Sequence, residues 1–156
     1  MFSTSTSLAL TAALFLSVNA ASATSVLTVT HGEETHEFDI AALQEMGAIE
    51  VATTTIWTEG VQNFAGIPLA TVLSEVGITE GSVAATAIND YSVEIPLDEI
   101  TDEYPVIAFH VDEEPMSVRD KGPFWIIYPF DLAPEWRTEV NFSRSIWQLT
   151  SLKPAE

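Results

Sequence analysis

Aromatic and basic side chains gather in the last quarter of the chain, where they could form a slot for a flat, polar heterocycle. The segment from Arg119 to Pro129 reads RDKGPFWIIYP, and Arg137 and the run RSIWQ at 144–148 follow it. Aromatic rings stack on planar ligands, while guanidinium and ammonium groups donate hydrogen bonds to ring oxygen or nitrogen atoms. The alternative is that Trp125 and Trp147 are core residues, as strand aromatics usually are.

The charge distribution sets the same part of the chain apart. The 156 residues include 5 Lys and Arg against 23 Asp and Glu, which gives a net charge of −18. Every basic residue lies after residue 118. The late cations could pair with early carboxylates to hold the fold, or they could form a positive pocket for an electron-rich or anionic ligand. Such a negative charge opposes binding to nucleic acid and to anionic lipid, so we expect neither as a partner.

The common catalytic motifs are missing from the sequence. It contains no cysteine, no HExxH, no GxSxG and no glycine-rich phosphate loop. His31 and His36 flank a predicted turn, and the paired acids at 33–34 and 113–114 lie in predicted turns. Carboxylates in turns are normally solvated, so we expect no metal site and assign no catalytic residue.

The elements that must position these residues are short and mixed. Patterns of β-branched and apolar residues predict strands over 26–30, 35–38, 49–57, 82–88, 91–95, 106–111, 124–128 and 145–152. Helical spacing predicts a helix over 40–46, capped by Asp39 and closed by Gly47, a second over 69–76 and a helical turn over 97–100. The expected class is α+β, a mixed β core with a few short helices.

Five short motifs occur in an order that resembles the sulfite-oxidase-type molybdopterin-binding fold. They are FxGIPLxxVL from Phe64, NDY at 89–91 with IPL at 95–97, KGP at 121–123, YP at 128–129 and RSIWQ at 144–148. The resemblance covers nearly all of the chain after its N-terminal segment. It implies an α+β fold with a mixed β core and a cleft that holds the pterin part of the cofactor.

One loop departs from the pattern of the enzymes in this family. The residues TTTIW at 53–57 correspond to the loop that presents the molybdenum-ligating cysteine, and they offer no thiolate. The resemblance therefore implies a pterin, in particular a reduced pterin, rather than the molybdenum cofactor. It leaves catalysis open and favours a non-catalytic role.

The resemblance, together with the side-chain chemistry, gives eight candidate pterin-binding residues. Trp57, Tyr91 and Trp125 are assigned to stacking, and the Asp90 carboxylate to the amino-pyrimidine edge, where it can accept two parallel N–H bonds. The candidates for polar contacts are the basic residues Arg119, Lys121, Arg137 and Arg144.

A cysteine-free subset of this fold resembles the chain further. These small periplasmic proteins have a GPxWxIYP-like segment and an RSxWQL ending. They are regarded as pterin-binding accessory proteins that report to a membrane sensor, such as a diguanylate cyclase or a histidine kinase. The resemblance implies the same role here, with a pterin and a sensor's periplasmic domain as partners. Two alternatives stay open: a molybdopterin-dependent oxidoreductase subunit, and a ligand-free interaction module whose cleft is closed by side chains.

The first 23 residues are typical of a secretory signal peptide. An uncharged apolar run at 8–18 precedes small residues that predict cleavage after Ala20 or Ala23. The run is shorter than the roughly 20 residues needed to cross a bilayer. We therefore expect a single domain, residues 24–156, in the periplasm or secreted, with no membrane insertion after cleavage. A retained N-terminal anchor is the alternative.

Overall fold

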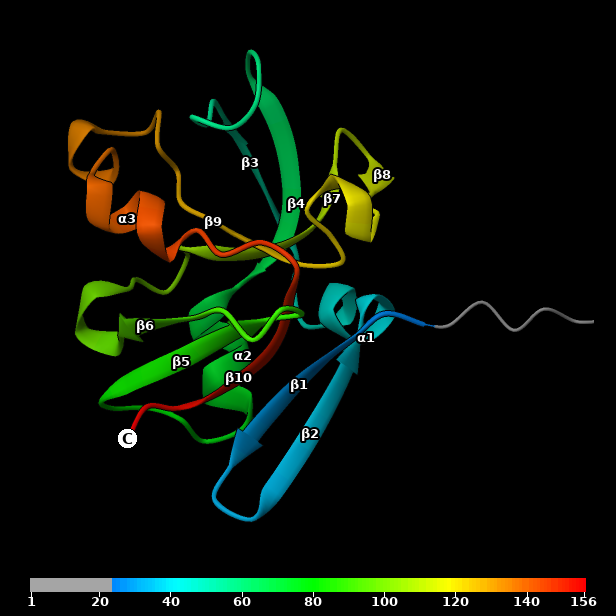
Figure 1. Cartoon of the computed structure of the whole chain (residues 1–156), viewed down its shortest axis with the longest axis vertical. Coiled ribbons are helices and arrows are strands. Elements are labelled where there is room, and N and C mark those ends of the chain that lie inside the picture. The colour runs from blue at the N-terminus through cyan, green and yellow to red at the C-terminus, as the bar shows by residue number, and fades with distance from the viewer. Residues whose placement is uncertain (1–23) are drawn as a thin grey trace, which may run out of the picture.

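Two β-sheets with short helices form the structure, a computed structural model that describes residues 24–156 (Figure 1). The predicted signal peptide, with Ala20 and Ala23, lies outside the described residues. In the first sheet the strands follow the order β2 (Glu34–Asp39), β1 (Val26–His31), β10 (Leu149–Pro154), β5 (Ser82–Ala87) and β6 (Ser92–Pro96). The pair β1–β10 is parallel and the other pairs are antiparallel, so the sheet is mixed.

The second sheet is antiparallel. It is built from β3 (Ile49–Thr53), β4 (Gln62–Pro68), β7 (Val106–Val111) and β8 (Glu114–Pro115), and β9 (Trp125–Ile127) also pairs with β7. The α-helices are α1 (Ile40–Glu45), α2 (Leu69–Glu75) and α3 (Glu139–Arg144), and the 3-10 turns are η1 (Leu97–Glu99), η2 (Val118–Asp120) and η3 (Pro134–Trp136). This architecture confirms the predicted α+β class with a mixed β core. Among residues 24–156, no helix is long and apolar enough to cross a membrane.

Local chemistry explains where the early elements begin and end. The Asp39 side chain accepts a hydrogen bond from the Ala42 N–H at 2.8 Å and caps α1, as predicted. Gly77 lies just after α2 with φ +80°, a conformation that favours glycine at a helix end. A large buried cluster that includes Leu27, Ile67 and Phe109 joins the strands and helices, and a smaller one forms around Phe64 and Trp125. This buried apolar surface is the main source of stability.

Two of the predicted strands are partly wrong, and both errors fall beside the candidate site. The strand predicted over 49–57 ends at Thr53, because the Thr54 N–H bonds to the Asp131 carboxylate instead of to a neighbouring strand. The strand predicted over 145–152 begins only at Leu149. Residues 139–144 form α3, whose first turn is capped by Thr138 through a hydrogen bond from the Asn141 N–H.

Backbone hydrogen bonds tie together the three segments that surround the site. The Ile88 N–H donates to the Gln148 carbonyl at 3.0 Å, and the Gln148 N–H donates to the Lys121 carbonyl at 2.9 Å. The Leu149 N–H donates to the Phe124 carbonyl at 2.9 Å. The β5–β6 turn, the segment before β9 and the segment before β10 are therefore held against one another.

Candidate functional site

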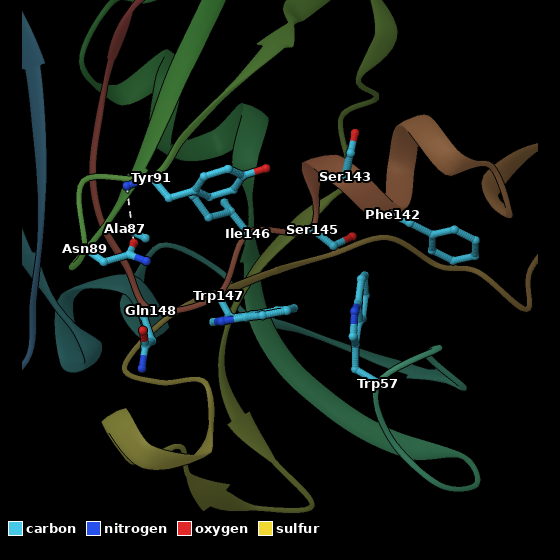
Figure 2. Close-up of a pocket in the computed structure, with 10 residues that line it drawn as sticks. All are labelled: Trp57, Ala87, Asn89, Tyr91, Phe142, Ser143, Ser145, Ile146, Trp147 and Gln148. Carbon is cyan, nitrogen blue, oxygen red and sulfur yellow. Dashed lines mark hydrogen bonds between the residues drawn. The ribbon is translucent and has the colours of Figure 1, made fainter.

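A pocket of about 330 Å³ lies where these segments meet the β3–β4 loop and α3 (Figure 2). Its size is that of small-molecule sites in proteins, which begin at about 300 Å³. Its lining is aromatic, apolar or polar without charge: Trp57, Ala87, Asn89, Tyr91, Phe142, Ser143, Ser145, Ile146, Trp147 and Gln148.

Aromatic rings form the walls of the pocket. Trp57 and Trp147 have ring centroids 5.5 Å apart with planes at 76°, and the Phe142 ring lies 6.0 Å from Trp57. Tyr91 comes from the β5–β6 turn on the other side, and its side chain points into the pocket (Figure 2). Tyr91 is 56 % exposed and Trp147 37 % exposed, so both present ring surface to a ligand. A planar ligand could stack on either ring.

Trp125 packs against the rings of this wall without lining the pocket. It is 1 % exposed, and its indole N–H donates to the Ser145 carbonyl at 3.1 Å. Its ring makes edge contacts with Trp57 and Trp147 at 6.0 and 6.3 Å. Trp125 is not among the lining residues, so its contribution is to hold the rings that are.

Three residues beside the pocket have a left-handed backbone although none is glycine. They are Asp90, Lys121 and Gln148, with φ of 65°, 73° and 52°. Such conformations cost energy and concentrate at functional sites. Asp90 lies in the β5–β6 turn, where its N–H donates to the Ala87 carbonyl at 3.0 Å, and it is not in the lining.

The basic candidates do not line the pocket. Lys121 lies close to the aromatic wall, with its Nζ 5.6 Å from the Trp125 ring centroid and 5.9 Å from that of Trp147. Arg119 is exposed on η2. Arg144 pairs with Glu99, and Arg137 bonds to Asp131, so the structure gives these two cations carboxylate partners.

The pairing of Arg144 also affects a buried phenol. Burial raises the pKa of Tyr128 far above its usual range, and the nearby Arg144 guanidinium lowers that pKa in part. Because Arg144 joins α3 to Glu99 on η1, it holds the helix that carries Phe142 and Ser143.

Hydrogen bonds to Asp131 fix the base of the loop that carries Trp57. The Asp131 carboxylate accepts from the Thr54 N–H at 2.6 Å and from the Thr54 hydroxyl at 2.7 Å, and Arg137 donates to it at 3.3 Å. The Asp131 N–H donates to the Thr53 hydroxyl at 3.2 Å. The Thr54 backbone bond, followed by the Thr54 hydroxyl bond, lowers the pKa of the Asp131 carboxyl.

The hydrogen bonds to the Asp131 carboxylate predict a pH-dependent difference in stability between the wild-type protein and Asp131→Asn. A lowered carboxyl pKa gives stability that is full above the unfolded-state pKa of about 4 and is lost as the pH falls through the folded-state value. Asp131→Asn is expected to lower the free energy of unfolding at pH 7 by about 1 kcal/mol or less, because the carboxylate is partly exposed. Urea unfolding at a series of pH values tests this. The gap between the two proteins should begin to close below about pH 4 and vanish only below the lowered folded-state pKa of Asp131. A gap that does not change with pH would contradict this role of the Asp131 carboxylate.

Comparison with known proteins assigns the fold to a family. Residues 17–136 match the family described as the oxidoreductase molybdopterin binding domain. The chain belongs to this family. The match includes the Trp57 loop and the β5–β6 turn and ends before α3 and Trp147.

A solved structure agrees with that assignment at the level of the fold. The molybdopterin-binding domain described here is similar to the sulfane dehydrogenase SoxCD from Paracoccus pantotrophus, with a TM-score of 0.60 and 15 % sequence identity. The alignment covers 83 % of this chain and 37 % of the SoxCD chain, so this protein spans little more than a third of that length. No curated protein matches the sequence.

The family name makes molybdopterin the first ligand to test against the residues present. The sequence has no cysteine, and within residues 24–156 no three His, Asp or Glu side chains group as a metal site would require. The loop at 53–57 therefore offers no thiolate, which is the ligand that molybdenum would need from this molybdopterin-binding domain. The aromatic, uncharged pocket fits the flat pterin part and does not fit the metal.

Sequence reasoning identified part of this site. Trp57 and Tyr91 were both predicted and both line the pocket. The pocket is also lined by four residues of the motifs NDY and RSIWQ that are not among the eight predicted candidates: Asn89, Ser145, Trp147 and Gln148. Phe142 and Ser143 carried no signal, because the sequence pattern did not predict α3.

Proposed function

We propose that this molybdopterin-binding domain binds a pterin without molybdenum and is a non-catalytic accessory protein. In this proposal it is exported to the periplasm and passes the ligand state to a membrane sensor, such as a diguanylate cyclase or a histidine kinase. The observation that carries the proposal is the open aromatic pocket between Trp57, Tyr91 and Trp147 in a fold whose family is named for a pterin cofactor. Stacking on such rings contributes about 1–3 kcal/mol per heterocyclic base in comparable sites.

The chemistry of the lining supports binding without catalysis. Among the described residues, neither a carboxylate nor a histidine lines the pocket, so a general base of the usual kinds is missing from its wall. The hydroxyls of Ser143 and Ser145 donate to backbone carbonyls of Val140 and Asn141, each at 2.7 Å. A serine needs an adjacent base to become a nucleophile, and these two bond to carbonyls instead.

The charge of the protein supports docking to another protein. With a net charge of −18, its surface would complement a basic face on the sensor's periplasmic domain, which would raise the rate of association. The volume of the pocket favours a ligand-binding role over the alternative of an interaction module with a closed cleft.

Replacing Tyr91 separates binding from folding. Tyr91→Ala is expected to weaken binding of 6-methyltetrahydropterin about tenfold, because one stacking surface is lost, while the exposed position leaves the melting temperature nearly unchanged. Calorimetric titration with the wild-type protein, Tyr91→Phe and Tyr91→Ala measures this. Tyr91→Phe keeps the ring and should bind as the wild type does, and Leu132→Ala, at an exposed position away from the pocket, is the surface control.

The titration also decides between pterin binding at this pocket and the alternative of an interaction module. No binding of either the oxidised or the tetrahydro form would favour the interaction module. Binding that is equally strong in Tyr91→Ala would place the ligand elsewhere on the protein.

A further inference from the structure

The hydrogen bonds within the pocket wall determine which polar atoms remain for a ligand. The Asn89 Oδ1 accepts from the Tyr91 backbone N–H at 3.2 Å (Figure 2). A backbone N–H can only donate, so the amide of Asn89 must turn its oxygen toward Tyr91. The Asn89 Nδ2, which donates, is therefore left for the pocket.

The side-chain amide of Gln148 has the opposite orientation, with its nitrogen bonded to the protein and its oxygen left over. Its Nε2 donates to the Val118 carbonyl at 2.7 Å. A carbonyl can only accept, so the amide nitrogen must face Val118 and the Oε1 is left as an acceptor. Within residues 24–156, no hydrogen bond to that Oε1 is present.

The main chain of Gln148 is held as firmly as its side chain. Its N–H donates to the Lys121 carbonyl, and its own carbonyl accepts from the Ile88 N–H of the turn that carries Asn89. The two amides therefore stand on adjoining, hydrogen-bonded segments of one wall. A binding group held at both ends is preorganised, which improves selectivity.

The other polar groups of the lining do not supply this pair. The Ser143 and Ser145 hydroxyls use their only hydrogens on backbone carbonyls and remain as acceptors. The indole N–H of Trp147 points to the same side as Asn89 and Gln148 and adds a donor (Figure 2). The wall thus offers both donors and acceptors, with Gln148 as its one free amide acceptor among the lining residues.

We propose that Asn89 and Gln148 read the polar edge of the ligand and select 2-amino-4-oxopteridines over 2,4-dioxopteridines. The Asn89 Nδ2 donates to the ring carbonyl, and the Gln148 Oε1 accepts from the 2-amino side. This inference rests on the proposed pterin function and specifies its ligand class. In a 2,4-dioxopteridine a carbonyl replaces the 2-amino group, so the exocyclic atom at position 2 offers the Gln148 Oε1 an acceptor in place of a donor.

The test compares 6-methylpterin with 6-methyllumazine, which differ in the 2-substituent and in the hydrogen on the adjoining N1. Calorimetric titration of the wild-type protein at pH 7 should give at least tenfold tighter binding of the pterin. Gln148→Met removes the acceptor at similar size, and the preference should fall to about twofold or less because the pterin alone loses a bond. Asn89→Asp keeps the acceptor for the Tyr91 N–H but removes the donor. It should weaken both ligands by a similar factor, since both carry the 4-oxo group.

Each outcome of these titrations tests either the selectivity inference or the proposed pterin function. Equal binding of the two ligands by the wild-type protein would overturn the selectivity inference and leave pterin binding intact. A preference that survives in folded Gln148→Met would also overturn it. If neither ligand binds and the tetrahydro forms also fail, the proposed function itself is wrong. The wild-type comparison stands even if a variant does not fold.

Discussion

Trp57→Ala is expected to lower the free energy of unfolding by about 3 kcal/mol and to weaken pterin binding at least tenfold. Both effects come from the same ring. Trp57 is half-buried and makes edge contacts with Trp125, Phe130, Phe142 and Trp147 at centroid distances of 5.5–6.4 Å. Truncation of a buried Trp to Ala costs about 3–5 kcal/mol, and partial exposure places this site at the lower end. The stacking surface lost from the pocket wall accounts for the affinity.

Two further variants separate these effects. Trp57→Phe keeps an aromatic ring in the same cluster and should recover most of both losses. Trp136→Ala removes a half-buried Trp that packs on Tyr104 and Tyr128, outside the pocket lining. It should lose stability and keep pterin affinity when both are measured well below the melting temperature. Wild-type affinity in Trp57→Ala would show that the β3–β4 loop is not a wall of the ligand site.

Gly122→Ala is expected to cost at least about 3 kcal/mol of stability, the upper end of the usual overpacking range. A Cβ at Gly122 would lie 2.0 Å from the Met116 carbonyl oxygen and 2.5 Å from its carbon. These are backbone atoms that cannot rotate away, and the Gly122 N–H is itself bound to the Ser117 carbonyl at 2.7 Å. The segment from 117 to 122 must therefore shift, and with it the Lys121 and Val118 carbonyls that hold Gln148.

A second glycine provides the matched control for this clash. Gly60 has φ +69°, and a Cβ there meets no atom within 4 Å. Gly60→Ala should cost only the backbone strain of about 1 kcal/mol. Chemical denaturation of both variants measures the difference. Similar stabilities for Gly122→Ala and Gly60→Ala would mean that the backbone near Met116 can shift at little energetic cost, which would contradict this prediction.

The sequence predicted the elements whose causes are local. The start of α1 at Asp39 and the end of α2 at Gly77 depend on interactions among residues close in sequence, and both predictions were confirmed. The strand end at Thr53 depends on Asp131, which lies 78 residues further along the chain and gives no local signal. The break before β10 likewise depends on bonds from Gln148 to the distant Lys121 and Ile88.

The candidate site was predictable by residue type and less so by position. Trp57 and Tyr91 were selected as stacking residues and lie on the pocket wall. The sequence allows two interpretations of the basic residues, and the structure shows pairing with carboxylates at Arg137 and Arg144. Asp90, which the sequence suggested as an acceptor, is not among the lining residues, whereas Gln148 is. The sequence could not predict which way the Gln148 amide faces, because a tertiary hydrogen bond fixes it.

The central claim is that this cysteine-free molybdopterin-binding domain takes a pterin without its metal. Its most direct test is to express the full chain in cells supplied with molybdenum, purify it, and measure bound pterin by fluorescence and bound molybdenum by mass spectrometry in the same sample. We expect bound pterin, or micromolar affinity for added tetrahydropterin, with molybdenum far below one atom per chain. Molybdenum bound one to one, or the absence of any pterin binding, would contradict it.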